Sequence, residues 1–278
     1  MGVHHRPPRD AGQDVIWLAA YLLAGTFIGF LAGLLGIGGG MMLVPILAAL
    51  FAAQGMAPEH GVHLSLGTCM ASIMFTSGSS VREHNRLGVV DWTIVRRMTP
   101  GMIAGTLAST AGAGFLSQRT LAVSFAVIVY AGAAQILLGR KPAAARRLPG
   151  AAPLFGVGAA IGAISGLVSA GGTFMTMPFL MFCGVPGLTA IATAAAIGIP
   201  ISLVGTIGYI GTGWRIADLP FGTLGFVYLP ALIPLVAASM LTAPYGARTA
   251  HRVPIHLLRR IFAAALFVLA TRMIVTYW

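Results

Sequence analysis

Two glycine-rich segments of this chain carry the residue types that could bind a small anion. Residues 29–45 read GFLAGLLGIGGGMMLVP and residues 162–178 read GAISGLVSAGGTFMTMP, with seven of 17 positions identical at an offset of 133. Glycines let the backbone approach a ligand closely, and the first N–H groups of a helix have no helical partner and attract negative charge. The candidate ligand-binding positions in these segments are Gly38, Gly39, Gly40, Gly171, Gly172 and Thr173.

Nearby hydroxyl groups could donate further hydrogen bonds to the same anion. We assign this role to Thr176 and, on the third apolar segment, to Thr68 and Ser72. Pro45 and Pro178 are expected to set the geometry of the short helix that follows each glycine cluster. The two copies differ, GIGGG against SAGGT, so we expect an asymmetric site whose selectivity lies on the threonine side.

Close helix packing is the alternative role for small residues in apolar helices. We favour packing for the pairs Gly29/Gly33 and Gly162/Gly166, which have the small-xxx-small spacing. Consecutive glycines weaken a helix by about 1 kcal/mol each. Because this cost occurs twice at matched positions, we favour a functional role for the two glycine clusters.

The composition indicates an integral membrane protein. Charged residues make up 8% of the chain and hydrophobic residues 57%, and residues 148–214 contain no Asp, Glu, Lys or Arg. Such a run is long enough for up to three spans of about 20 residues each. Sixteen of the 17 basic residues are Arg in or near short loops, which is typical of membrane topology signals and argues against nucleic-acid binding.

The uncharged stretches predict ten helical segments, eight long and two short. The short ones, 41–53 and 173–184, cannot cross a hydrocarbon core of about 30 Å at about 1.5 Å per residue. Each follows a glycine cluster, which predicts a helix broken inside the membrane. The long segments are 15–35, 64–81, 98–118, 120–139, 151–170, 188–212, 221–246 and 258–276.

The chain divides into two related halves of five segments each. Besides the glycine-rich copies, residues 99–117 align with 233–251, pairing Pro100 with Pro234. The predicted organisation is an N-terminal tail, a first transmembrane repeat, a basic linker and a second transmembrane repeat, over residues 1–14, 15–139, 140–150 and 151–278.

The arginines predict which ends of the segments face the cytoplasm. If all five segments of each half cross and the N-terminus lies outside, 12 basic residues fall inside and four in outer loops. If the short segments are re-entrant, the best orientation places 11 basic residues inside and five outside. We favour the first count, in which an odd number of segments per half makes the second half an inverted repeat of the first.

Other chemistry has weaker support in the sequence. His60 and His63 with Glu83 and His84 could suggest a metal, but we expect them on two different loops and predict no metal site. Serine-hydrolase, zinc-enzyme and nucleotide-binding patterns do not occur, so we predict neither an enzyme nor a bound cofactor. Glu83 or Asp91 is a candidate for coupling to a proton or cation.

At these residues the chain resembles the sulfite exporter TauE/SafE family, also grouped with toluenesulfonate uptake permeases. The resemblance rests on GLLGIGGGMMLVP, LSLGTCMASIMF, HNRLGVVDW and ISGLVSAGGTFMTMP. It implies a permease of the bacterial cytoplasmic (inner) membrane that carries a small sulfur-containing anion, such as sulfite, a sulfonate or sulfoacetate, by alternating access. An anion channel and a non-transporting membrane scaffold are the alternatives. The second half lacks the Leu66-Gly67-Thr68 triplet, which argues against symmetrical use of the halves.

The favoured arginine count predicts a cytoplasmic location for the linker. A reporter enzyme fused after Gly150 should therefore show cytoplasmic activity, and one fused after Arg215 should show activity on the outer side. A Gly150 fusion that reports the outer side would contradict the predicted inverted repeat.

Overall fold

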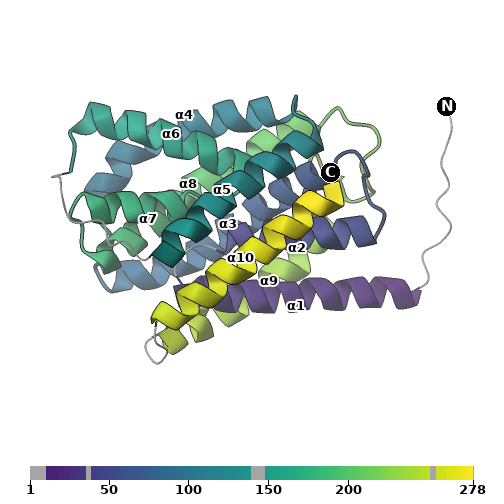
Figure 1. The fold of residues 1–278 in the computed structure, drawn as a ribbon, viewed down its shortest axis with the longest axis horizontal. Coiled ribbons are helices and arrows are strands. Elements are labelled where there is room, and N and C mark those ends of the chain that lie inside the picture. Colours follow the sequence, from purple (N-terminus) through teal and green to yellow (C-terminus); the bar gives the residue numbers. More distant parts are fainter. Residues whose placement is uncertain (1–10, 36–38, 139–147, 251–254, 278) are drawn as a thin grey trace.

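The protein is an all-helical bundle. The computed structural model describes residues 11–35, 39–138, 148–250 and 255–277, which form ten helices and one two-stranded hairpin (Figure 1). The first half contains α1 (Ala11–Leu35), α2 (Gly40–Ala53), α3 (Gly61–Arg86), α4 (Trp92–Ala113) and α5 (Gln118–Leu138). The second contains α6 (Ala151–Val168), α7 (Thr173–Phe182), α8 (Gly187–Gly213), β1 (Thr223–Leu224), β2 (Val227–Tyr228), α9 (Leu229–Ala250) and α10 (Ile255–Tyr277).

Length and composition fit the predicted membrane protein. Among the described residues, four helices are long and apolar enough to cross a bilayer, over residues 12–33, 151–168, 187–213 and 229–246. Many of their large apolar side chains, such as Leu23 and Ile233, point outward and are more than half exposed. Lipid would cover these surfaces, since a soluble protein rarely exposes so much contiguous apolar area.

The two short segments are broken-off helices, as predicted. Helix α2 has 14 residues and α7 has 10, so at about 1.5 Å per residue they are only about 21 Å and 15 Å long. Gly39 precedes α2 with φ 62° and Gly172 precedes α7 with φ 74°. Both angles lie in the left-handed region, which favours glycine, so these residues turn the chain sharply between two helices.

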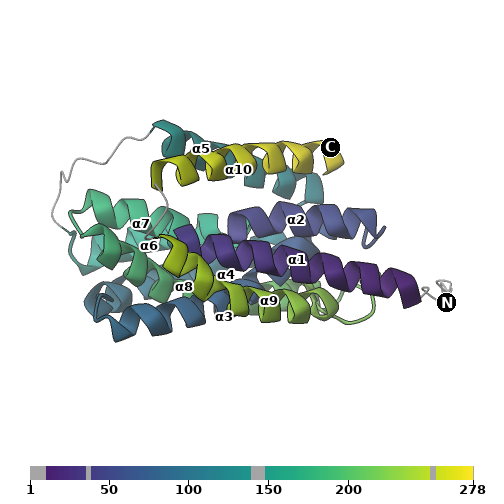
Figure 2. The ribbon, with the colours of Figure 1, turned by 90° about the horizontal axis from the view of Figure 1, so that it is seen from below.

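Helix pairing between the halves is reciprocal. Helix α1 packs along α9, and its counterpart α6 packs along α4. The third helices, α3 and α8, pack on each other, and so do the fifth helices, α5 and α10, which form a layer at one face of the bundle (Figure 2). Exchanging the halves turns each of these four pairs into one of the same set, which is the pattern that a two-fold relation produces, although α2 packs more closely on α10 than α7 does on α5.

Individual contacts fix which residues correspond between α4 and α9. A methyl group on Gly29 of α1 would overlap the backbone of Ser239, and one on the matching Gly162 of α6 would overlap the backbone of Met102. Met102 and Ser239 are 137 positions apart, whereas the sequence pairing of Pro100 with Pro234 assumed 134. The predicted alignment of 99–117 with 233–251 is therefore wrong by three residues.

The three-residue error in this alignment arises because connections of different length lead into α4 and α9. Residues 87–91 connect α3 to α4, whereas residues 214–228, with the β hairpin, connect α8 to α9. Asp91 caps α4, because its side chain accepts hydrogen bonds from the backbone N–H groups of Thr93 and Ile94 at 2.9 Å and 3.2 Å. Tyr228 stands at the corresponding position before α9.

Close approach of helix backbones depends on small residues. Gly162 and Gly166 of α6 face α4, where added methyl groups would overlap Met102 and Ser109, and Gly29 faces α9 in the same way. These contacts confirm the packing interpretation for the three glycines.

The packing of α6 on α4 yields a matched pair of variants. Gly162→Ala should lower the thermal unfolding temperature in detergent, because forcing a methyl group into a filled contact costs about 1–3 kcal/mol. Gly156→Ala, on the same helix with no atom within 4 Å of the new methyl, should leave that temperature unchanged or raise it slightly. Equal unfolding temperatures for the two variants would contradict the contact.

Candidate functional site

The glycine turns of the two halves meet against the third helix. The Cys69 thiol of α3 lies 3.4 Å from the Gly40 carbonyl oxygen and 3.6 Å from the Ser169 carbonyl oxygen, and it donates to both. Ser169 ends α6 with φ 49° and donates its own hydroxyl to the Leu66 carbonyl oxygen at 2.9 Å. Helix α3 therefore supplies hydrogen-bond partners for the chain just after the first break and just before the second.

One turn further along α3, an isoleucine covers both breaks. A methyl group on Gly40 would lie 2.5 Å from Ile73 Cδ1, and one on Gly171 would lie 2.8 Å from Ile73 Cγ2. Ile73 is 2% exposed. The starts of α2 and α7 thus come together inside the protein, with an apolar side chain packed between them.

Two matching hydrogen bonds show how α3 and α8 correspond. The Thr68 hydroxyl of α3 accepts the Tyr228 backbone N–H at 2.9 Å, and the Thr193 hydroxyl of α8 accepts the Asp91 backbone N–H at 3.0 Å. Tyr228 and Asp91 are the equivalent residues before α9 and α4. Thr193 is thus the counterpart of Thr68, and Ile191-Ala192-Thr193 takes the place of the triplet that the second half was predicted to lack.

The same correspondence places Gly198 opposite Ile73. A methyl group on Gly198 would lie 3.1 Å from the Gly171 carbonyl oxygen, 3.2 Å from Ser77 Oγ and 3.5 Å from Thr173 Oγ1. One half therefore has a large side chain where the other has none. Two hydroxyl groups and the Gly171 carbonyl oxygen therefore lie close around the Gly198 backbone on the α7 side, whereas an apolar side chain occupies the matching position on the α2 side.

These two hydroxyls are free to serve a ligand. Ser77 is 5% exposed and Thr173 is 2% exposed. In the part of the chain that the structure describes, no hydrogen bond engages either hydroxyl. Ser77 was missed by sequence reasoning. It lies two turns beyond Cys69 on the same face of α3, a spacing that becomes informative only once Cys69 and Ile73 are known to contact the breaks.

The other predicted site residues are the glycines of the two breaks, three residues with hydroxyl groups and two prolines. Gly39, Gly40, Gly171 and Gly172 form the breaks and are buried, whereas Gly38 lies outside the described residues.

The hydroxyls of Thr68 and Thr176 already have structural hydrogen bonds, since Thr176 donates to the Gly172 carbonyl oxygen at 2.7 Å. Ser72 is buried on α3 beside Ile73.

Pro45 and Pro178 each occupy the sixth position of their helix. Because proline has no N–H, the carbonyl four residues earlier loses its helical partner in the first turn of each short helix.

The sequence predicted the histidines on two different loops, and this prediction is wrong. His63 stands at the start of α3 and His84 near its end, with His60 just before the helix. Across the described residues, no three His, Cys, Asp or Glu side chains come together in a way that could hold a metal ion.

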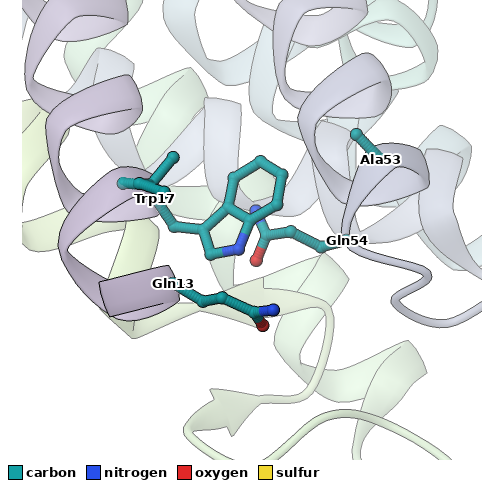
Figure 3. Close-up of a pocket in the computed structure, with 5 residues that line it drawn as sticks. Gln13, Trp17, Ala53 and Gln54 are labelled. Carbon is teal, nitrogen blue, oxygen red and sulfur yellow. The ribbon is translucent and has the colours of Figure 1, made fainter. Parts of the chain in front are cut away.

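A pocket of about 270 Å³ lies at the far end of α2 from its glycine turn. It is lined by Gln13, Ile16, Trp17, Ala53 and Gln54, and Figure 3 shows the Trp17 ring beside the Gln13 and Gln54 side chains. The Gln54 amide donates to the Tyr21 hydroxyl at 2.6 Å, which ties α2 to α1. The pocket is therefore a polar recess between the ends of two helices, separate from the breaks.

Two related halves, each with a glycine-broken helix in its interior, form the architecture of membrane transporters. The chain belongs to the sulfite exporter TauE/SafE family, whose match covers residues 21–273.

Similar proteins carry a matching description. A probable membrane transporter protein of Haemophilus influenzae is 32% identical over 255 residues, covering 91% of this chain and 96% of that relative. Others of the same description are 27% identical over 262 residues in Xylella fastidiosa, covering 92% and 94%, and 25% identical over 236 residues in Methanocaldococcus jannaschii, covering 84% of each chain. No solved structure matches the chain. The protein is a membrane transporter.

The hydrogen bonds of Thr68 and Thr193 to the opposite half predict two losses of stability that differ in size. Thr68→Val leaves the N–H of the buried Tyr228 without an acceptor, which should cost about 1–3 kcal/mol and lower the thermal unfolding temperature. Thr193→Val should cost less, because Asp91 is only half-buried. Thr276→Val, at an exposed position, is the control and should change nothing. An unchanged unfolding temperature for Thr68→Val would contradict the role of this bond.

Proposed function

We propose that this protein is a secondary transporter that moves a small sulfur-containing anion, such as sulfite, a sulfonate or sulfoacetate, across the bacterial cytoplasmic membrane by alternating access. The observation that carries the proposal is the meeting of two buried helix starts, α2 and α7, at glycine turns held by one face of α3. Each start has N–H groups without helical partners and the positive end of the helix dipole.

The α7 side is the binding side in this proposal. Thr173 and Ser77 supply hydroxyl donors, the first turn of α7 supplies N–H donors, and the absence of a side chain at Gly198 brings these groups close together. A sulfonate or sulfite group presents several oxygens around one sulfur and can accept hydrogen bonds from such a set at once. None of the groups named here carries a full charge, which suits an anion that must dissociate on the far side of the membrane.

Inverted insertion of the two halves explains how access could alternate. Helix α1 begins at one end of the bundle and α6 begins at the opposite end (Figure 1). Together with the reciprocal helix pairing, this arrangement supports an inverted repeat. The two halves could then exchange conformations, opening the site to one side and then to the other.

The apolar cover over the breaks favours a transporter over a permanently open channel. Ile73 separates the start of α2 from the start of α7, so an anion cannot pass along both without a rearrangement of α3. In a channel, a continuous polar path would be expected instead.

Transport by purified protein in lipid vesicles tests this function. Sulfite, thiosulfate, sulfoacetate and taurine should be compared with simple carboxylates for uptake against a gradient. Concentrative uptake of a sulfur-containing anion supports the proposal. Purely downhill flux that does not saturate would favour a channel, and the absence of any anion flux would contradict the proposal.

Three valine variants should abolish transport while leaving membrane insertion intact. Gly39→Val and Gly172→Val place a branched side chain at left-handed φ angles, and Gly198→Val fills the space beside Ser77 and Thr173. We expect flux to fall by about tenfold or more, equivalent to about 1.4 kcal/mol or more at the barrier.

Gly112→Val and Gly211→Val are the matched controls for these variants. Both lie in helices with no atom within 4 Å of a new Cβ, and both should transport at the level of the unmodified protein. Normal flux in Gly172→Val or Gly198→Val would contradict the assignment of the site.

A further inference from the structure

A buried histidine at the start of α3 has one ring nitrogen without a partner. His63 is 2% exposed, and its Nε2 lies 3.1 Å from the carbonyl oxygen of Ala113, the last residue of α4. A carbonyl can only accept, so Nε2 carries the hydrogen and donates it. In the neutral ring, Nδ1 is then an acceptor, and it is buried without a hydrogen-bond partner. An unmet buried acceptor costs about 1–3 kcal/mol, so such atoms call for an explanation.

Two rings pack against His63, and further acceptors without partners lie at the same end of the molecule. The His60 ring stands 5.6 Å from the His63 ring at 76°, and the Phe226 ring stacks on His63 at 4.9 Å and 28°. His60 Nδ1 is likewise buried without a partner. Gln118, which donates to the Pro58 carbonyl oxygen at 2.6 Å, has its Oε1 buried without a partner at the same end of the molecule.

The neighbouring elements carry few other ionisable groups. The turn before α3 contains Glu59 and His60, α5 opens with Arg119 after Gln118, and the connection from α8 to β1 contains Arg215 and Asp218. Burial holds the pKa of His63 below its ordinary value, and the charge of His60 lowers it further. Two imidazolium rings at 5.6 Å would repel each other, which disfavours a charge on both rings at once.

We propose that His63, with His60, forms a proton-binding site that couples proton uptake to anion transport. The step adds one proton to the Nδ1 lone pair of His63 and produces an imidazolium ring stacked on the face of Phe226, where a cation is favourable. The role in coupling rests on the proposed transport function.

Helix α3 connects this site to the anion site. His63 lies on the same continuous helix as Cys69, Ile73 and Ser77, the residues that contact the glycine breaks. The stacked ring of Phe226 belongs to the hairpin that leads into α9, whose preceding N–H binds Thr68 of α3. A proton that shifts the start of α3 relative to this hairpin would therefore move Ile73 between the two breaks.

Uptake of methanesulfonate into vesicles at varied external pH tests the proposal. A sulfonate keeps its charge over this pH range, so changes in rate report the protein. Because burial lowers the pKa of His63, we expect uptake to rise as pH falls below about 6.5, by up to about tenfold per pH unit, as binding of one proton requires. A fluorescent dye inside the vesicles should show proton entry during uptake.

Variants assign the effect to one histidine. His63→Gln should lose the pH dependence and the proton entry, and His60→Gln should retain both with a displaced midpoint. His84→Gln, at the other end of the same helix, is the control and should behave as the unmodified protein. A normal pH profile in His63→Gln would overturn the proposal.

A second measurement keeps the proton site separable from the transport function. Histidine ring signals in an NMR titration of the purified protein should include one that titrates below about pH 6.5 and disappears in His63→Gln. If methanesulfonate is not transported but this signal titrates, the substrate assignment fails and the proton site stands. If no signal assigned to His63 titrates, the proton site is overturned whatever the transport result.

Discussion

A helix that ends inside a membrane protein leaves backbone N–H and carbonyl groups that water cannot satisfy, and the interior must supply their partners. This constraint explains why one face of α3 runs across both glycine turns. The Cys69 thiol binds carbonyls from each turn, and Ser169 anchors the end of α6 to α3. The N–H groups at the starts of α2 and α7 have no partners within their helices, and they are suited to an anionic ligand.

The near-repetition of the halves makes their differences informative. Thr68 and Thr193 make the same hydrogen bond to the opposite half, which shows that the frame of the bundle is shared. Within this frame, Ile73 stands on α3 where Gly198 stands on α8. The result is an apolar contact at the start of α2 and a polar one at the start of α7, where Ser77 and Thr173 lie beside Gly198. A symmetric pair of sites is therefore not expected, even though the two glycine-rich segments are similar in sequence.

Much of the fold could be predicted from sequence because its signals are local. Segment length, glycine clusters and the absence of charge identify the short helices to within two residues at either end. The inequality of the glycine-rich copies also indicated an asymmetric centre.

The correspondence of distant positions could not be predicted in this way. Helix α7 is four residues shorter than α2, and the turn after it is also shorter, so α8 is displaced along the sequence relative to α3. The offset falls from 133 at the glycines to 125 at Thr68 and Thr193, and the pairing of Ile73 with Gly198 is visible only in three dimensions. Ser77 was missed for the same reason.

The most direct test is an experimental structure of the protein in lipid with sulfite bound. The account predicts density for the anion at the start of α7, within hydrogen-bond distance of Thr173 and Ser77 and against Gly198. Density confined to the start of α2 or to the recess beside Trp17, with the α7 start empty, would contradict it.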